Sequence, residues 1–188
     1  MKKIPDHAKK VFEGIVFDVY HWGQEQFDGS ISMFEALRKR DNVTVIAVCD
    51  GKIAINHEEQ PAREPFIGFP GGQCEKGEND VLSSAKRELL EETGLASDDW
   101  ELLFISDPLN NQKIDWSNYF YVARNCKKVA DQHLDIGEKI ATSFITFEEF
   151  LDLRNNPMFR NKDINDLLTK VAEDSEERKK LQQSLGII

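Results

Sequence analysis

The alternation of apolar and polar residues predicts that the first sixty residues are mainly β-structure. Residues 11–20 are β-branched and aromatic with partial alternation, which indicates a strand. Residues 31–38 fit either a strand or a short helix. Residues 43–49 form a nearly continuous apolar run, typical of a strand that is covered on both faces. An Asp-Gly pair at residues 50–51 favours a hairpin turn that leads into a returning strand at residues 52–56.

The pattern changes in the middle of the chain, where helix breakers precede a helix. One Phe, one Pro and two Gly at residues 69–72 predict a turn. Residues 81–93 predict a helix that Asn79 or Asp80 caps at its start and that Gly94 ends. The same patterns predict further strands at residues 101–106, 118–124 and 142–146, amphipathic helices at 147–153 and 162–171, and a charged helix or frayed end at 173–183.

Length and composition are those of a globular protein. The 188 residues suit one large domain, or one domain with an appendage. The chain is 40% hydrophobic and 31% charged, which excludes a disordered chain, a collagen-like chain and a coiled coil. No apolar run approaches membrane-spanning length, so we expect no membrane partner. No apolar stretch follows the basic first residues, so we expect no secretion signal.

The charge and the cysteines narrow the class of partner and the compartment. There are 34 acidic and 24 basic residues, a net charge of −10 that repels phosphate backbones and argues against nucleic-acid binding. A phosphorylated substrate remains compatible, because a divalent metal reverses the local field. Cys49, Cys74 and Cys126 match neither a disulfide framework nor a zinc pattern. We interpret them as reduced thiols of a cytoplasmic protein.

Three carboxylates share one face of the predicted central helix. Glu91 and Glu92 lie about 60° and about 40° to either side of Glu88, because successive residues turn by about 100°. Like charges at this spacing destabilise a helix by about 0.2–0.5 kcal/mol per pair. Lys86 and Arg87 are close in sequence, but we expect no cation on that face to relieve the repulsion. Such hard oxygen ligands suit Mg²⁺ or Mn²⁺; a solvated acidic face is the alternative.

The residues around this cluster resemble the signature box of the Nudix hydrolases. In that box a glycine is followed after five residues by a glutamate, and after seven more by Arg-Glu-apolar-any-Glu-Glu-any-Gly-apolar. Residues 87–95 match every defined position of the second half, and Gly72 and Glu78 match the first half. Eight residues, 79–86, separate the halves where the family has seven. The simplest account is one extra loop residue, which leaves the helical face intact but leaves open the role of Glu78, the usual partner of the box arginine.

The resemblance implies an α+β fold, in which a mixed β-sheet is sandwiched between α-helices (α/β/α) and carries an N-terminal antiparallel β-sheet extension. We expect residues 1–41 to form this extension and to serve homodimerisation. Residues 42–172 would form the Nudix domain, and residues 173–188 a C-terminal helical tail.

The resemblance also implies roles for the residues of the box. Glu88, Glu91 and Glu92 would be ligands of Mg²⁺ or Mn²⁺, and the carbonyl of Gly71, just before the box, would be a further ligand. Arg87 would orient the carboxylates across the loop and the helix.

Hydrolysis also needs a general base, and its identity stays open. Glu138 lies in an acidic loop that resembles the one carrying the base in ADP-ribose pyrophosphatases, although an ordinary exposed turn is an equal alternative. Asp135 in the same loop is a second candidate, and Glu91 could serve directly.

Three features resemble the ADP-ribose pyrophosphatase branch of the family, and one departs from it. The strand-rich extension is the first. The second is Arg63, which resembles an arginine that reaches the substrate phosphate in that branch; the alternative is an ordinary surface arginine. The third is Pro108, which follows the box as a proline often does in that branch. Apart from these three, Trp22 resembles an aromatic that stacks on the base in relatives, or is a core or interface residue. The departure is Gly68, where the branch often has a glutamate.

The resemblance therefore implies Mg²⁺-dependent hydrolysis of the diphosphate bond of a nucleoside diphosphate sugar. ADP-ribose is the first expectation, and the products would be a nucleoside monophosphate and a sugar phosphate. GDP-mannose or another nucleoside diphosphate sugar is the alternative substrate. A non-catalytic sensor of nucleotide sugars is an alternative of another class. Action on modified nucleoside triphosphates is disfavoured by the N-terminal extension.

Overall fold

The structure, a computed structural model, describes residues 4–61, 63–76, 80–107 and 113–187. Its central sheet has the strand order β12-β5-β4-β10-β8, with β6 paired to β5. The strands are β4 (Asn42–Cys49), β5 (Lys52–Glu59), β6 (Phe66–Gly68), β8 (Asp99–Ser106), β10 (Asn118–Arg124) and β12 (Lys139–Ile145). The pair β4–β10 is parallel and the other pairs are antiparallel, so the sheet is mixed.

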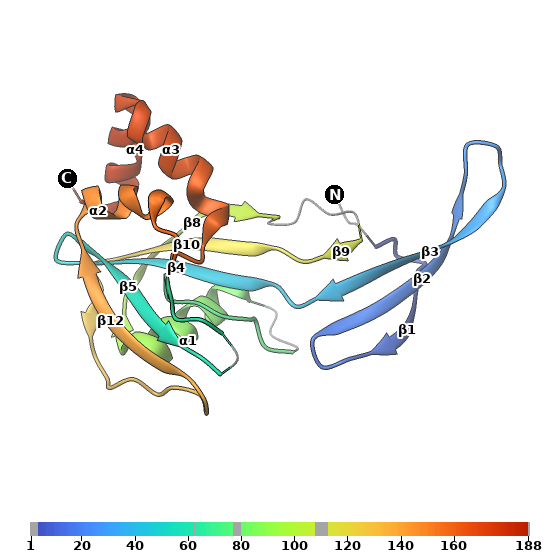
Figure 1. Ribbon diagram of the computed structural model, residues 1–188, viewed down its shortest axis with the longest axis horizontal. Helices are drawn as coiled ribbons and strands as arrows, with labels where there is room; N and C mark the ends of the chain where they lie inside the picture. The colour runs from blue at the N-terminus through green and yellow to red at the C-terminus, as the bar shows by residue number, and fades with distance from the viewer. Residues whose placement is uncertain (1–3, 62, 77–79, 108–112, 188) are drawn as a thin grey trace.

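Helices cover both faces of this sheet (Figure 1). The helix α1 (Val81–Thr93) packs on one face, where Ala85 and Leu89 are fully buried. The other face carries α2 (Phe147–Asp152), α3 (Asn165–Glu173) and α4 (Ser175–Leu185). Because both faces are covered, the residues of β4 are apolar in either direction. The predicted α/β/α arrangement is confirmed.

The predicted limits of α1 are also confirmed, because local caps set them. The side chain of Asp80 accepts a hydrogen bond from the N–H of Leu82, and Asn79 lies outside the described residues. Gly94 has a φ of 67°, and its N–H bonds the carbonyl of Leu90. A Cβ at Gly94 would also lie 2.1 Å from the carbonyl oxygen of Ala130. Both the positive φ and this close contact therefore require glycine at position 94.

A second sheet extends to one side of the molecule (Figure 1). Its order is β1-β2-β3-β9. The strands are β1 (Lys9–Glu13), β2 (Phe17–Glu25), β3 (Ile31–Lys39) and β9 (Ile114–Asp115). The predicted single strand at residues 11–20 is therefore wrong. The chain turns at Gly14, whose N–H bonds the carbonyl of Phe17 at 3.1 Å, and this sheet buries too little to show a clear alternation. The ambiguous segment 31–38 is a strand.

Short elements complete the fold. Two 3₁₀ turns span Leu153–Asn155 and Lys162–Ile164, and a two-stranded ladder joins β7 (Leu95–Ala96) to β11 (Lys127–Lys128). The predicted helix at residues 162–171 thus begins as a 3₁₀ turn and continues as α3. Among the helices of the described residues, none is long and apolar enough to cross a membrane.

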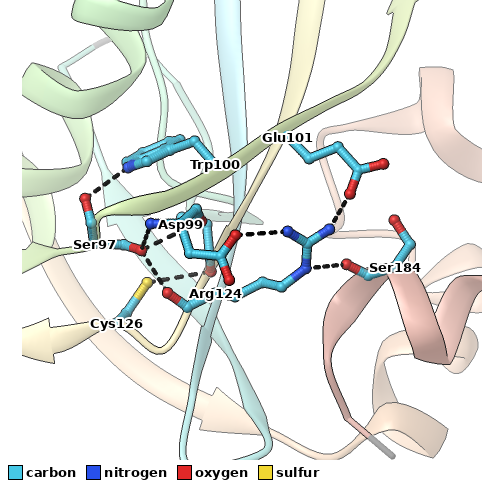
Figure 2. Close-up of polar contacts among 8 residues, drawn as sticks. Ser97, Asp99, Trp100, Glu101, Arg124, Cys126 and Ser184 are labelled. Carbon is cyan, nitrogen blue, oxygen red and sulfur yellow. Dashed lines mark hydrogen bonds and ion pairs between the residues drawn. The ribbon is translucent and has the colours of Figure 1, made fainter.

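The C-terminal segment is an ordered helix rather than a frayed end. Leu181 and Leu185 of α4 belong to the main core. Arg124 at the end of β10 holds the end of this helix (Figure 2), because its Nε donates to the carbonyl of Ser184 at 2.5 Å. The two terminal nitrogens of Arg124 bind Asp99 and Glu101 on β8. One guanidinium therefore joins β8, β10 and α4.

We expect replacement of Arg124 by alanine to loosen α4 and to lower the free energy of unfolding by about 2 kcal/mol, because charged hydrogen bonds and a packed aliphatic stem are lost. Urea unfolding of this variant beside Lys127→Ala, a change at an exposed lysine near the same strand end, measures the effect. Equal stability of the two variants would contradict the proposed anchoring.

Candidate active site

A cleft of about 470 Å³ lies between α1, the end of β5 and the loop that precedes β12. Six glutamates line it: Glu58, Glu75, Glu88, Glu91, Glu92 and Glu138. The cleft therefore gathers carboxylates from β5, from the segment before α1, from α1 itself and from the loop before β12. Gly71 and Gly72 of the predicted turn form part of its wall.

The turn before α1 is held close against β4. The carbonyl oxygens of Pro70 and Gly72 accept hydrogen bonds from the backbone of β4 at 2.8 and 2.9 Å. A Cβ at Gly71 would lie 2.2 Å from the carbonyl oxygen of Val43, and Gly71 has a φ of 151°. No other residue fits Gly71 without moving the backbone of β4.

Glu92 is one of two carboxylates of the cleft that are almost fully buried, with 7% of its surface exposed. One oxygen of Glu92 accepts hydrogen bonds from the N–H of Gly71 at 2.9 Å and from Nδ2 of Asn56 at 3.0 Å. Burial raises the pKa of Glu92 well above its usual range, and the neighbouring carboxylate of Glu58 adds to this shift. Glu92 thus links α1, the glycine turn and β5.

Arg87 neutralises the other two carboxylates of α1. Its terminal nitrogens lie 2.9 Å from Glu88 and 2.8 Å from Glu91. The expectation that no neighbouring cation relieves this face is therefore wrong, because the long arginine side chain reaches both acids. A Cβ at Gly72 would lie 2.6 Å from the carboxyl carbon of Glu88, so the missing side chain makes room for that carboxylate. Burial raises the pKa of Glu88 to about 7, although Arg87 opposes the shift.

The donor chemistry of the cleft suits a divalent metal. As they stand, no three His, Cys, Asp or Glu side chains in the described ranges are arranged to enclose an ion. The three glutamates of α1 nevertheless face one cleft together with Gly71, and all their donor atoms are hard oxygens. The space that Gly72 leaves for Glu88 is a further feature that fits a carboxylate aimed at an ion.

Glu58 lies in this cleft, and the sequence analysis missed it. It stands on β5, is 5% exposed, and burial raises its pKa to about 7. The signal was present in the strand period, because Ala54, Asn56 and Glu58 fall on one face of β5 while His57 is exposed. Ending the predicted strand at residue 56 concealed it.

Basic side chains also line the cleft. Lys39 is the last residue of β3, Arg40 follows it, and Arg160 comes from the loop before α3. Burial lowers the pKa of Lys39, and the charges of Arg160 and Arg40 add to the shift. None of the three was predicted, because each is far in sequence from the box. The predicted Arg63 is exposed and does not line the cleft.

The loop before β12 brings its acids to the same cleft. Both Glu138 and Asp135 line it. Nε2 of Gln60 lies 3.5 Å from Oε1 of Glu138. Burial raises the pKa of Glu138, and the charge of Asp135 adds to the shift. Glu138 is therefore placed near the carboxylates of α1.

Other predicted residues lie elsewhere. Trp22 is buried in the N-terminal sheet, where its ring lies 5.7 Å from that of Phe34 and its Nε1 donates to Gln24. It does not line the cleft of its own chain. Glu78 and Pro108 fall outside the described residues.

A second pocket of about 360 Å³ adjoins the cleft and shares Glu58, Gly71 and Arg160 with it. Its lining is polar and includes Asn118 and Trp116. The indole N–H of Trp116 is buried and has no hydrogen-bond partner among the described residues. The adjoining pocket thus offers charged and neutral hydrogen-bonding groups, among them Asn118, Asn161 and Asp163, next to the acidic cleft.

Comparison with known proteins agrees with this architecture. A crystal structure of an ADP compounds hydrolase is 19% identical, with a TM-score of 0.69, over 97% of this chain and 95% of that chain. A structure from a study of MutT from Aliivibrio salmonicida and Vibrio cholerae is also 19% identical, with a TM-score of 0.51, over 71% and 95% of the two chains. At this identity the likeness shows the fold alone. No curated protein matches the sequence. A family model of the NUDIX domain matches residues 38–164, more than half of the chain, and the protein therefore belongs to the Nudix family of pyrophosphohydrolases.

Proposed function

We propose that the protein hydrolyses the diphosphate bond of a nucleoside diphosphate sugar, with ADP-ribose as the first candidate and a nucleoside monophosphate and a sugar phosphate as products. One observation carries the proposal: the carboxylates of α1 face Lys39, Arg40 and Arg160 in one cleft. An acidic metal-binding wall opposite basic side chains is what a multiply charged diphosphate requires. The adjoining polar pocket offers room for the group attached to the diphosphate.

Glu88, Glu91, Glu92 and the carbonyl of Gly71 would hold Mg²⁺ or Mn²⁺. When bound, the ion would supply charge neutralisation and polarisation of a phosphate oxygen. Arg87 positions Glu88 and Glu91 through its two ion pairs. Because Arg87 already balances part of their charge, the site can fold before an ion arrives.

The basic side chains orient the diphosphate. Arg160 lies where the cleft meets the adjoining pocket, so it can bind the phosphate next to the sugar. Lys39 stacks over the ring of Trp116 at 4.2 Å, which holds its ammonium group at the cleft. We keep Arg63 as a further phosphate-binding candidate, because its charge acts on Glu58 and Lys39.

Glu138 is our candidate general base, and Asp135 and Glu91 are the alternatives. Its position in the cleft supports this role, and burial raises the pKa of its carboxyl group, which makes it a stronger base. Its contact with Gln60 supports a defined orientation of the carboxylate.

The substrate proposal is tested by incubating the protein with ADP-ribose, GDP-mannose and a nucleoside triphosphate, each with Mg²⁺ and with a chelator. We expect AMP and ribose phosphate from ADP-ribose, faster than turnover of the other two, and no turnover with the chelator. Faster release of GMP from GDP-mannose would assign the alternative substrate. Tight binding of ADP-ribose without turnover would instead identify a sensor.

We also propose that the protein is a homodimer that associates through the sheet formed by residues 1–41. Large apolar side chains on this sheet are exposed: Phe12 at 61%, Ile15 at 95%, Phe27 at 114% and Met33 at 73%. Exposed apolar side chains of this size on one sheet favour association. Sedimentation equilibrium tests the proposal, and a monomer at all concentrations would contradict it. In such a dimer Trp22 could serve the cleft of the second chain.

We also propose a cytoplasmic location and three parts of the chain: the extension at residues 1–41, the Nudix domain at 42–172 and the tail at 173–188. The free thiols of Cys49, Cys74 and Cys126 support a reducing compartment. The separate sheet of β1, β2 and β3 supports the first boundary. The burial of Leu181 and Leu185 indicates that the tail stabilises the Nudix domain rather than acting alone.

A further inference from the structure

Side chains that line the adjoining pocket are joined in one chain of hydrogen bonds. Oδ1 of Asn161 accepts from the backbone N–H of Phe69 at 3.0 Å, which fixes the orientation of this amide group. Its Nδ2 therefore faces the hydroxyl group of Thr44, at 3.5 Å. Thr44 donates to Oδ1 of Asn118 at 3.1 Å, and Nδ2 of Asn118 donates to Oδ2 of Asp163 at 3.0 Å. Every hydrogen bond of this chain thus points toward the carboxylate.

Two members of the chain are buried within the central sheet. Thr44 on β4 is 3% exposed, and Asn118 at the start of β10 is 6% exposed. The two strands are parallel neighbours. Burying polar groups costs free energy unless they are hydrogen-bonded, and a satisfied buried network is rigid. The network therefore holds Asp163, which lies in the 3₁₀ turn before α3, in a defined position at the pocket.

Asp163 retains one carboxylate oxygen for a ligand. Its Oδ1 has no hydrogen bond or ion pair with any residue that the structure describes. The adjacent cation, Lys162, is engaged elsewhere, because its Nζ donates to the carbonyl of Asn156 at 2.8 Å. A hydrogen-bond donor that enters the pocket would therefore meet an acceptor that is already oriented, whereas an anionic group would be repelled.

The lining favours a hydroxyl-rich group over a flat base. The indole N–H of Trp116 is buried and has no partner among the described residues, so the pocket offers an unused donor as well as an acceptor. A hydroxyl group suits both, because it donates and accepts. A nucleobase gains much of its affinity by stacking on an aromatic ring. Here Phe69 is 3% exposed and packs edge-on against Phe159. Lys39 lies over the ring of Trp116.

Building on the proposed function, we propose that the adjoining pocket binds the sugar half of the substrate, and that Asp163 determines the specificity for it by accepting a hydrogen bond from a sugar hydroxyl group. Asn118 is the positioning residue, because it holds Oδ2 and leaves Oδ1 for the sugar. Arg160 lines both the pocket and the cleft, which places it beside the phosphate next to the sugar. Both Asp163 and Asn118 lie outside the signature box.

Binding of the separate halves of the substrate to the full chain tests this inference without turnover. The probes are ribose 5-phosphate and mannose 1-phosphate as sugar halves, and AMP and GMP as nucleotide halves, each titrated by calorimetry. We expect Asp163→Asn to bind the preferred sugar phosphate about 10-fold more weakly or worse, and both nucleotides within about two-fold of the unaltered protein. The asparagine can still accept from Asn118, but its amide nitrogen then replaces the remaining acceptor by a donor.

Asp166→Asn is the matched control. Asp166 is exposed on α3 and does not line the pocket, so the change removes the same charge without touching the site. This variant should bind all four probes as the unaltered protein does. Asp163→Ala should show the same loss as Asp163→Asn, and it decides the test if urea unfolding shows that the asparagine variant does not fold.

The inference is overturned if Asp163→Asn weakens the binding of the nucleotides and not of the sugar phosphates, since the pocket would then hold the base. An equal loss for both halves, or binding no different from that of Asp166→Asn, would overturn it as well. So would a failure of the unaltered protein to bind either sugar phosphate, even if ADP-ribose is hydrolysed. Conversely, sugar-phosphate binding that depends on Asp163 in a protein that hydrolyses no candidate substrate would refute the proposed function and leave the assignment of the pocket standing.

Discussion

Replacing Glu92 with glutamine is expected to reduce the proposed diphosphate hydrolysis by roughly a thousand-fold or more, because one of the three carboxylates proposed to bind the metal is lost. Folding should be preserved. A single oxygen of Glu92 accepts the hydrogen bonds from Gly71 and Asn56, and the carbonyl oxygen of glutamine can accept the same two. The change also removes one charge from a buried group of acids, so stability at neutral pH should hold or rise.

The measurement is kcat with ADP-ribose and Mg²⁺, combined with urea unfolding. Glu173→Gln at the exposed end of α3 is the control, since it removes the same charge far from the cleft. Activity of Glu92→Gln within a few-fold of this control would refute the metal assignment. Loss of activity together with loss of folding would contradict the argument about its hydrogen bonds.

Alanine at Gly71 should mainly lower the stability of the protein, whereas alanine at Gly72 should mainly impair the cleft. Gly71→Ala places a Cβ 2.2 Å from a backbone oxygen of Val43 and forces a φ of 151° on an alanine. We expect it to lower the free energy of unfolding by about 3 kcal/mol or more, since the backbone of β4 must move. Gly72→Ala meets the side chain of Glu88 instead, so it should reduce Mg²⁺ affinity and turnover with a smaller loss of stability.

Chemical unfolding and Mg²⁺ titration of both variants separate the two effects. Gly51→Ala, in the open hairpin turn after β4, is the control for the cost of alanine at a positive φ, because no atom lies within 4 Å of its Cβ. If Gly71→Ala were no less stable than Gly51→Ala, the close contact with β4 would not constrain the turn.

The sequence predicted those parts of the fold that local signals set. The limits of α1 depend on Asp80 and Gly94, which lie at its own ends. The strand β4 is recognisable as a continuous apolar run because both its faces are covered. The turn at Gly14 was missed because β1 is exposed along its length, so burial imposes no alternation there. Where an element is not packed against a core, its pattern carries little information about its ends.

The same distinction applies to the candidate site. Glu88, Glu91 and Glu92 are neighbours on one helix, so their spacing alone brings them together. Arg160 reaches the cleft from a loop that follows α2, which no local pattern encodes, whereas Glu58 lies on the buried face of β5 that the strand period indicates. The reach of the Arg87 side chain was missed for a different reason: helical angles describe where a residue starts, not where a long side chain ends.

The small strand β9 ties the protruding sheet to the floor of the adjoining pocket. Leu37 of β3 bonds the carbonyl of Lys113, and Arg38 pairs with Asp115 at 2.9 Å. The next residue, Trp116, carries the ammonium group of Lys39 on its ring. The position of the protruding sheet and the position of Trp116 in the adjoining pocket are therefore coupled through these three contacts.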